Sequence, residues 1–144
     1  MSVSFRRLEV GDFDKGFLGV LSQLTKVGNV TKELFTKRFN LQSQNPLHHT
    51  FVGEKDGKIV CTAALLIEPK FIHECKNTGH IEDVAVDKQM RGTGLGKKLI
   101  THLLDDAKKH DCYKVILDCA DHNIGFYKSC GLDKHGNEMA VYLE

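Results

Sequence analysis

The feature that most constrains this chain is a glycine-rich segment between a predicted strand and a predicted helix. Residues 79–86 favour a strand because they are rich in β-branched side chains, and residues 91–96 (RGTGLG) follow. Apolar residues then recur at helical spacing over residues 95–107. The first N–H groups of such a helix lack intrahelical acceptors and lie at its positive end, so they bind anions. The segment therefore predicts a site for an anionic cofactor, with a purely structural turn as the alternative.

Two common phosphate-binding loops are excluded by the glycine spacing. A Walker loop needs four residues between its first glycine and its Gly-Lys pair, whereas Gly92 and Gly96 enclose three. The dinucleotide fingerprint is Gly-x-Gly-x-x-Gly, but this chain has Gly-x-Gly-x-Gly, and it lies beyond residue 90. A kinase-like, GTPase or Rossmann cofactor site is therefore not expected.

The rest of the chain predicts one mixed α/β domain over residues 1–144, without a repeat or linker. Lys55-Asp56-Gly57 predicts a hairpin turn, Thr31 predicts a helix N-cap, and Gly131 is expected to close the last short helix. The predicted elements are a strand near 3–8, helices over 13–28 and 31–44, strands over 49–54, 58–67 and 79–86, a helix over 95–107, a strand over 113–119, a short helix capped by Asn123, and a last strand over 138–143.

Composition excludes several classes of protein. Twenty Lys and Arg against nineteen Asp and Glu give a formal charge of +1, too balanced for general nucleic-acid binding. The longest uncharged apolar run, residues 59–67, is too short for a membrane span, and no signal-peptide pattern is expected. Five cysteines without a Cys-x-x-Cys pair predict reduced thiols. We therefore expect a cytoplasmic protein, with organelle import left open.

Six short motifs carry a family resemblance: residues 70–73 (KFIH), 79–86 (GHIEDVAV), 91–96 (RGTGLG), 112–114 (CYK), 117–119 (LDC) and 123–127 (NIGFY). Over about residues 5–139 the chain resembles the eukaryotic glucosamine 6-phosphate N-acetyltransferases of the GNAT superfamily. The resemblance implies the GNAT fold, a mixed central sheet flanked by helices. It also implies a homodimer that acetylates glucosamine 6-phosphate with acetyl-CoA, in the synthesis of UDP-N-acetylglucosamine.

The resemblance further implies which residues form the site. Acetyl transfer to an amine needs a free-base nucleophile, polarisation of the thioester carbonyl and a proton for the leaving thiolate. The implied catalytic residues are Glu82 as base, Asp118 as its charge partner and Tyr127 as donor to the thiolate. The implied cofactor-binding residues are Val84, Ala85, Val86, Arg91, Gly92, Thr93, Gly94, Leu95, Gly96, Asn123 and Tyr127. The implied substrate-binding residues are Thr25, Lys70, Phe71, Ile72, His73, Glu82, Asp83, Tyr113, Lys114 and Asp118.

Two adjacent acids, Glu82 and Asp83, end the strand before the glycine-rich segment. Side chains alternate along a strand, so these two are expected to point to opposite faces of the sheet. Only one of them could then face a given site wall directly. Solvated acids at a strand end are the alternative interpretation.

One position departs from the family pattern: Tyr142 lies where family members carry an arginine that contacts the phosphate. Tyr142 can donate a hydrogen bond but supplies no charge. The spacing of His73, Cys75 and His80 matches no common zinc pattern, so no metal is expected. An acetyltransferase of another small amine, or a noncatalytic acyl-CoA sensor, remains the alternative function.

Overall fold

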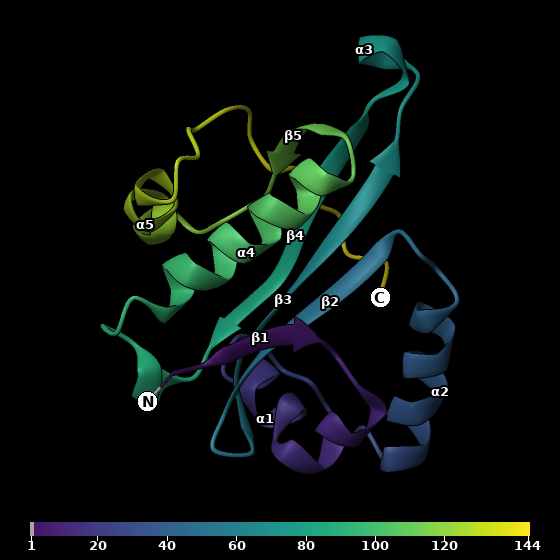
Figure 1. The fold of residues 1–144 in the computed structure, drawn as a ribbon, viewed down its shortest axis with the longest axis vertical. Coiled ribbons are helices and arrows are strands. Elements are labelled where there is room, and N and C mark those ends of the chain that lie inside the picture. Colours follow the sequence, from purple (N-terminus) through teal and green to yellow (C-terminus); the bar gives the residue numbers. More distant parts are fainter. Residues whose placement is uncertain (1) are drawn as a thin grey trace.

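The computed structural model describes residues 2–144, and its framework is a five-stranded sheet of strand order β1-β2-β3-β4-β5 (Figure 1). β1 to β4 pair antiparallel, and β5 pairs with β4 in parallel. The predicted mixed sheet is therefore confirmed. The strands are β1 (Ser4–Arg7), β2 (His48–Lys55), β3 (Lys58–Pro69), β4 (Asn77–Val86) and β5 (Cys112–Ile116).

Helices cover both faces of the sheet. The apolar side of α4 packs on the face that includes Phe51, whereas α1 and α2 pack on the face that includes Val52. None of the helices in the described part of the chain is both long and apolar enough to span a bilayer. The helical elements are η1 (Val10–Lys15), α1 (Phe17–Leu21), α2 (Lys32–Ser43), α3 (Ile72–Cys75), η2 (Lys88–Met90), α4 (Leu95–Lys109), η3 (Asp121–Asn123) and α5 (Ile124–Ser129).

Local sequence signals account for several element boundaries. Thr31 is the N-cap of α2, and its Oγ1 accepts a 3.1 Å hydrogen bond from the Leu34 N–H. Asp56 and Gly57 both have positive φ (51° and 78°), as a type I′ hairpin turn requires. Gly131, at φ 97°, follows the C-cap of α5. These three predictions are confirmed.

Two predicted boundaries are wrong. Gly16 adopts a left-handed conformation (φ 88°) that separates η1 from α1, so the first predicted helix is split and ends at Leu21. β5 ends at Ile116, before residue 119. Asn123 is at the N-cap position of α5, as predicted, but its side chain makes no capping hydrogen bond. The reason is that the 3-10 turn η3 leads directly into α5, so the Asn123 backbone is already helical.

The predicted last strand is also wrong. Residues 133–144 form neither helix nor strand, and the Met139, Tyr142 and Leu143 side chains are each more than 90% exposed. A strand needs a neighbouring strand to satisfy its backbone hydrogen bonds, and no strand among residues 2–144 pairs with this segment. The alternating apolar pattern therefore lacks a partner within one chain.

An ion-pair network fastens β1 and η1 to β2. Arg6 donates two 2.8 Å hydrogen bonds to the fully buried Asp12 and one of 2.6 Å to Glu54. Burial alone would raise the pKa of Asp12, but hydrogen bonds from Arg6 and the Glu9 backbone outweigh burial and lower it. The hydrogen bond from Arg6 also lowers the pKa of Glu54. The network fixes the chain where it turns towards α1, which forms one wall of the site.

Candidate functional site

β4 pairs with β5 only along its first half. The parallel register runs from Asn77 opposite Cys112 to His80 opposite Ile116, whereas β4 continues to Val86. Across residues 2–144, no strand pairs with this edge of β4 beyond His80. An open strand edge presents backbone N–H and C=O groups that can bind an extended ligand. The second half of β4 therefore has an open strand edge at which an extended ligand can bind.

A β-bulge interrupts the second half of β4, on the side that pairs with β3. Thr62 pairs with Ala85 and Ala64 with Glu82, so Ala63 lies opposite the two residues Asp83 and Val84. Asp83 has φ 52°, a left-handed conformation that costs a non-glycine residue roughly 1–2 kcal/mol. The bulge changes the regular alternation of side chains, and Glu82 and Asp83 line the same pocket. The prediction that they face opposite sides is therefore wrong.

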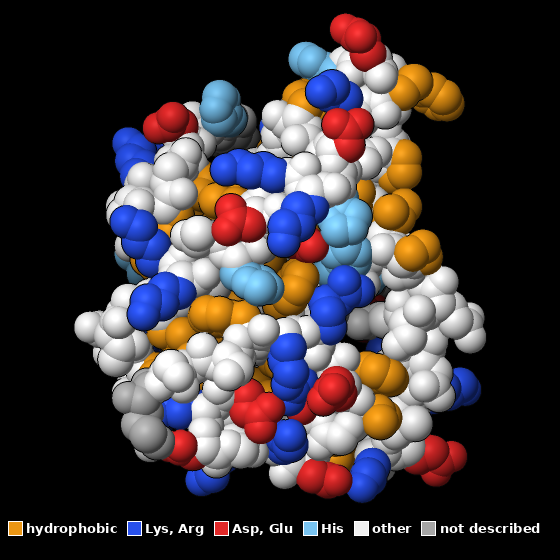
Figure 2. Space-filling model, in the orientation of Figure 1, with side chains coloured by type: hydrophobic (Ala, Val, Ile, Leu, Met, Phe, Trp, Pro, Cys, Tyr) orange, Lys and Arg blue, Asp and Glu red, His pale blue; other side chains and the backbone are white. Residues whose placement is uncertain are grey.

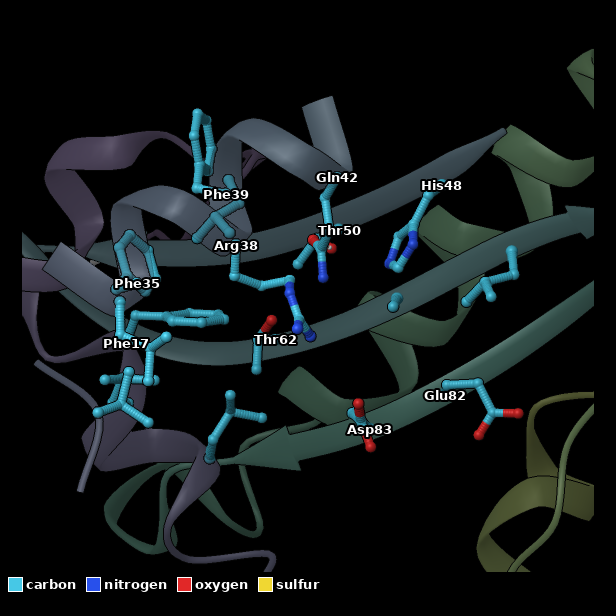
Figure 3. Close-up of a pocket in the computed structure, with 17 residues that line it drawn as sticks. Phe17, Phe35, Arg38, Phe39, Gln42, His48, Thr50, Thr62, Glu82 and Asp83 are labelled. Carbon is cyan, nitrogen blue, oxygen red and sulfur yellow. Dashed lines mark hydrogen bonds between the residues drawn. The ribbon is translucent and has the colours of Figure 1, made fainter. Parts of the chain in front are cut away.

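This pocket has a volume of about 500 Å³ and lies between α1, α2 and the sheet face formed by β2, β3 and β4. Figure 3 shows aromatic side chains at one end, Glu82 and Asp83 at the other, and Arg38 reaching between them. The apolar lining residues are Leu8, Phe17, Leu18, Leu21, Val30, Leu34, Phe35, Phe39, Ala64 and Leu66. The pocket therefore combines a closed apolar end with an acidic end that adjoins the bulge.

Sequence reasoning missed five polar lining residues. Arg38 and Gln42 come from α2, His48 and Thr50 come from β2, and Thr62 comes from β3. A signal was present, because Arg38 and Gln42 follow Phe35 at intervals of three and seven residues and so share its helix face. Polar residues on a helix face that is otherwise buried indicate a lined cavity rather than a solid core.

The carboxylates shape the electrostatics of the pocket. Burial, with the nearby charges of Asp83 and Asp118, raises the pKa of Glu82. Glu138 of the C-terminal segment adds to this effect, so the segment passes near the site. Burial, followed by the charges of His49 and Arg7, lowers the pKa of His48. Glu82 thus has a higher proton affinity than an ordinary glutamate, which favours a role as general base.

The glycine-rich segment forms a turn at the N-terminus of α4. Gly92 and Gly94 both adopt left-handed conformations (φ 81° and 82°), and Gly94 is the N-cap without a side-chain hydrogen bond. The first N–H groups of α4 are consequently free for an anion. Gly96 serves packing, since a Cβ there would lie 3.0 Å from the Phe126 ring. The residues present therefore fit a phosphate-bearing cofactor, with Arg91 and Thr93 exposed beside the turn.

Tyr127 lies in α5, beside the start of α4. It is half-buried against the core, and its neighbour Phe126 contacts Gly96. Burial, with smaller effects from Cys119 and Cys130, raises the pKa of Tyr127. Its hydroxyl is therefore protonated at neutral pH and able to donate. Asn123 is exposed at the start of the same helix, and Asp118 is exposed on the segment after β5.

The remaining predicted substrate residues lie outside the pocket lining. His73 stacks on Tyr113 with ring centroids 4.0 Å apart, and Lys114 Nζ lies 5.6 Å from the Tyr113 ring centroid. Lys70 pairs with Glu68 at 3.3 Å. Thr25 is exposed, just after α1. The structure thus gathers His73, Tyr113 and Lys114 into one group, but one chain does not bring this group to Arg38 and Thr25.

The tip of the β3–β4 connection is strained and exposed. His73, Glu74 and Cys75 have successive positive φ values of 49°, 59° and 62°, unusual for residues other than glycine. Phe71 is 95% exposed and Ile72 is 54% exposed. Figure 1 shows the tip, labelled α3, projecting beyond the body of the fold. Strain and exposed apolar side chains together indicate a binding surface.

The cofactor loop generates a prediction that has a matched control. Gly94 and Gly57 share a left-handed conformation (φ 82° and 78°) and open space around an added Cβ. Alanine should therefore destabilise both positions by roughly 1 kcal/mol. Only Gly94 adjoins the free N–H groups of α4, where a Cβ obstructs a phosphate. We expect Gly94→Ala alone to weaken coenzyme A binding, by about tenfold, in calorimetric titrations. Equal coenzyme A affinity in the two variants would exclude this loop as the site.

Comparisons with known proteins agree with this geometry. The profile of the acetyltransferase (GNAT) family matches residues 20–132. The glucosamine 6-phosphate N-acetyltransferase of Candida albicans is 45% identical over 138 residues, which span 94% of this chain and 93% of that protein. The Arabidopsis thaliana enzyme of the same name is 44% identical over 142 residues, 96% of this chain and 95% of that protein.

A solved structure gives the same result. The crystal structure of glucosamine-6-phosphate N-acetyltransferase from Arabidopsis thaliana superposes with a TM-score of 0.96 at 43% identity and covers 100% of both chains. The predicted GNAT fold is confirmed. The chain belongs to the acetyltransferase (GNAT) family and, within it, to the glucosamine 6-phosphate N-acetyltransferases.

Proposed function

We propose that this protein transfers the acetyl group of acetyl-CoA to the amine of D-glucosamine 6-phosphate, giving N-acetylglucosamine 6-phosphate. The observation that carries the proposal is the bulge in β4, which places Glu82 and Asp83 on one pocket beside an open strand edge. Identity above 40% to enzymes of this name over nearly the whole chain supports the choice of substrate. We place the reaction in the cytoplasm, in the supply of UDP-N-acetylglucosamine.

The cofactor site that we propose runs from the α4 N-terminus to the open edge of β4. Residues 91–96 and the free N–H groups of α4 hold the pyrophosphate. Backbone groups of Val84, Ala85 and Val86 bind the extended arm, because no strand among the described residues occupies the edge there. Acetyl-CoA supplies an activated acyl thioester. The bulge places Glu82 and Asp83 on the pocket directly before these residues, where the amine arrives.

The acid and base roles follow from the protonation states. Glu82 accepts a proton from the substrate amine, directly or through water, and its raised pKa strengthens it as a base. Asp118 and Asp83 attract the ammonium form of the substrate. Tyr127 keeps its proton because its pKa is raised, so it can hydrogen-bond the leaving thiolate. Asn123 borders the same end of α5.

The substrate phosphate requires positive charge, and Tyr142 supplies none. Arg38 reaches into the pocket from α2, and within residues 2–144 it has no acidic partner within salt-bridge distance. A free guanidinium opposite two carboxylates complements a molecule that carries both an amine and a phosphate. We propose Arg38 as a phosphate ligand, together with His73 and Lys114 of a second copy of the chain.

We also propose a homodimer. The C-terminal segment exposes Met139, Val141, Tyr142 and Leu143, and the β3–β4 tip exposes Phe71. Monomeric proteins rarely expose so many large apolar side chains. An apolar segment with strand-like alternation and no strand partner in its own chain suits pairing with a second copy. The second copy would also bring a projecting tip to the partner's pocket, where its His73 and Lys70 could complete the phosphate site.

The substrate assignment predicts a strong preference for the phosphorylated sugar. We expect kcat/KM for glucosamine 6-phosphate to exceed that for glucosamine by at least about a hundredfold, because the phosphate supplies binding energy that orients the amine. Arg38→Gln should reduce this ratio by about tenfold, whereas Lys109→Gln on the far end of α4 should leave it unchanged. A thiol-release assay measures both. Equal rates on the two sugars would refute the substrate, and an unaltered ratio in Arg38→Gln would refute the role of Arg38 alone.

The acid and base roles predict two different changes in the pH profile of kcat. In the wild type, kcat should fall as the pH drops through the raised pKa of Glu82, because its protonated form cannot act as a base. Glu82→Gln should lower kcat roughly a hundredfold at neutral pH and move the fall to higher pH, where the amine loses its proton unaided. Tyr127→Phe should lower kcat roughly tenfold at every pH without moving the fall. A wild-type profile in either variant would remove that residue from the mechanism.

The dimer proposal predicts a solution mass twice that of one chain in light scattering at micromolar concentration. Tyr142→Glu should shift the protein towards monomer, because a charge would be buried in the interface. Leu41→Glu is the control, since Leu41 is 60% exposed on α2, a helix that belongs to neither apolar segment. A fully active wild-type monomer would contradict the proposal.

A further inference from the structure

A second cluster of reactive side chains lies on the opposite sheet face from the pocket. His49 on β2 is 2% exposed, and its neighbours His48 and Thr50 line the pocket on the other face. Asp106 lies in the last turn of α4, and His110 is the C-cap of that helix. One donor atom from each of His49, Asp106 and His110 lies within 4.8 Å of the other two. The proposed acetyl transfer uses none of these three residues.

Both ring nitrogens of His49 face oxygen atoms that accept hydrogen bonds. Nε2 lies 2.7 Å from the Pro46 carbonyl oxygen, which can only accept, so Nε2 carries a proton. Nδ1 lies 2.5 Å from Asp106 Oδ2, which as a carboxylate also accepts. A neutral imidazole has one N–H, which Nε2 already carries. The lone pairs of His49 Nδ1 and Asp106 Oδ2 therefore face each other, and either an additional proton or a metal ion must lie between them. Zinc bonds of about 2.0–2.1 Å in tetrahedral geometry would separate these atoms to roughly 3.3 Å, a movement below ~1 Å.

His110 shows the same division of its ring nitrogens. Its Nδ1 lies 2.8 Å from the Asp106 main-chain oxygen and 3.5 Å from Asp106 Oδ1, so Nδ1 donates and Nε2 retains its lone pair. The His49 and His110 rings have centroids 4.7 Å apart. Asn77 Nδ2 donates a 2.7 Å hydrogen bond to the His110 carbonyl and steadies this end of α4. Histidines that bind metals commonly give their other N–H to a backbone carbonyl, as both do here.

The geometry points to a binding site for a divalent transition-metal ion, best filled by Zn²⁺, with His49, Asp106 and His110 as its protein ligands. Two nitrogen donors and one carboxylate favour Zn²⁺, Co²⁺ or Ni²⁺ over Mg²⁺ and Ca²⁺. The negative end of the α4 dipole adds attraction for a cation. The partly exposed His110 leaves the fourth position to water. The ion would tie β2 to α4 across 57 residues of chain.

The test uses the purified full chain, freed of metal by chelation and titrated with Zn²⁺ in a calorimeter. We expect one equivalent to bind and to raise the melting temperature. Asp106→Asn and the exposed His110→Gln should each weaken binding at least about tenfold. The control is His102→Gln, one turn earlier on α4, whose ring stacks on Phe5 and contacts Phe51 edge-on instead; it should leave Zn²⁺ affinity unchanged.

Three results would overturn the assignment. They are an absence of Zn²⁺ binding, wild-type affinity in both Asp106→Asn and His110→Gln, or an equal loss in His102→Gln. Substitution by Co²⁺ gives an independent check, because a nitrogen and oxygen site shows no thiolate charge-transfer band. Such a band would assign the ion to the exposed Cys75 or Cys119 and would also refute the proposal.

Discussion

The site depends on one local distortion, the β-bulge at Asp83 and Val84. A regular β4 would place Glu82 and Asp83 on opposite faces and would leave the pocket with a single acid. The extra residue, with Asp83 held at φ 52°, brings both acids to the pocket. Backbone strain of this kind persists where the surrounding structure enforces it. Here Thr62 and Ala64 of the central strand β3 hold the register on either side.

The helix α4 fixes the position of the anion site relative to the bulge in β4. Its N-terminus presents free N–H groups at Gly94, and its buried face, which includes Leu99, Ile100 and Leu103, fixes the helix on the sheet. These three residues are fully buried, so the helix cannot shift without opening the core. One rigid element therefore sets the distance between the phosphate-binding turn and the open edge of β4. The C-terminus of the same helix carries the proposed metal ligands, where the dipole has the opposite sign.

The sequence predicted the elements that local chemistry determines. The hairpin at Asp56-Gly57, the N-cap Thr31 and the helix after Gly94 all follow from turn, capping and periodicity rules, and the structure has each of them. Features that depend on the pairing register of the strands could not be predicted from the sequence. The bulge needs the pairing of β4 with β3, so Glu82 and Asp83 were assigned to opposite faces. Arg38 required knowledge of which helix face covers a cavity rather than a packed core.

Contacts between residues far apart in the chain could not be predicted from the sequence either. His49 and Asp106 are separated by 57 residues, and no spacing rule connects them. The apolar alternation over residues 138–143 predicted a strand, but pairing requires a partner that one chain does not provide. Family resemblance supplied the roles of Tyr127 and Asp118, which periodicity alone could not assign. The departures from prediction thus cluster at the bulge, the pocket and the tail, where tertiary context overrides local preference.

The central claim is that the acyl donor and the amine meet at the bulge, between the α4 N-terminus and the α2 pocket. Residue-resolved amide hydrogen exchange, with and without coenzyme A, tests it most directly. The account predicts slower exchange at residues 84–86 and 92–97 with coenzyme A, and further slowing around Glu82 and Asp83 when N-acetylglucosamine 6-phosphate is added. Unchanged exchange at both segments, with protection elsewhere in the chain, would contradict it.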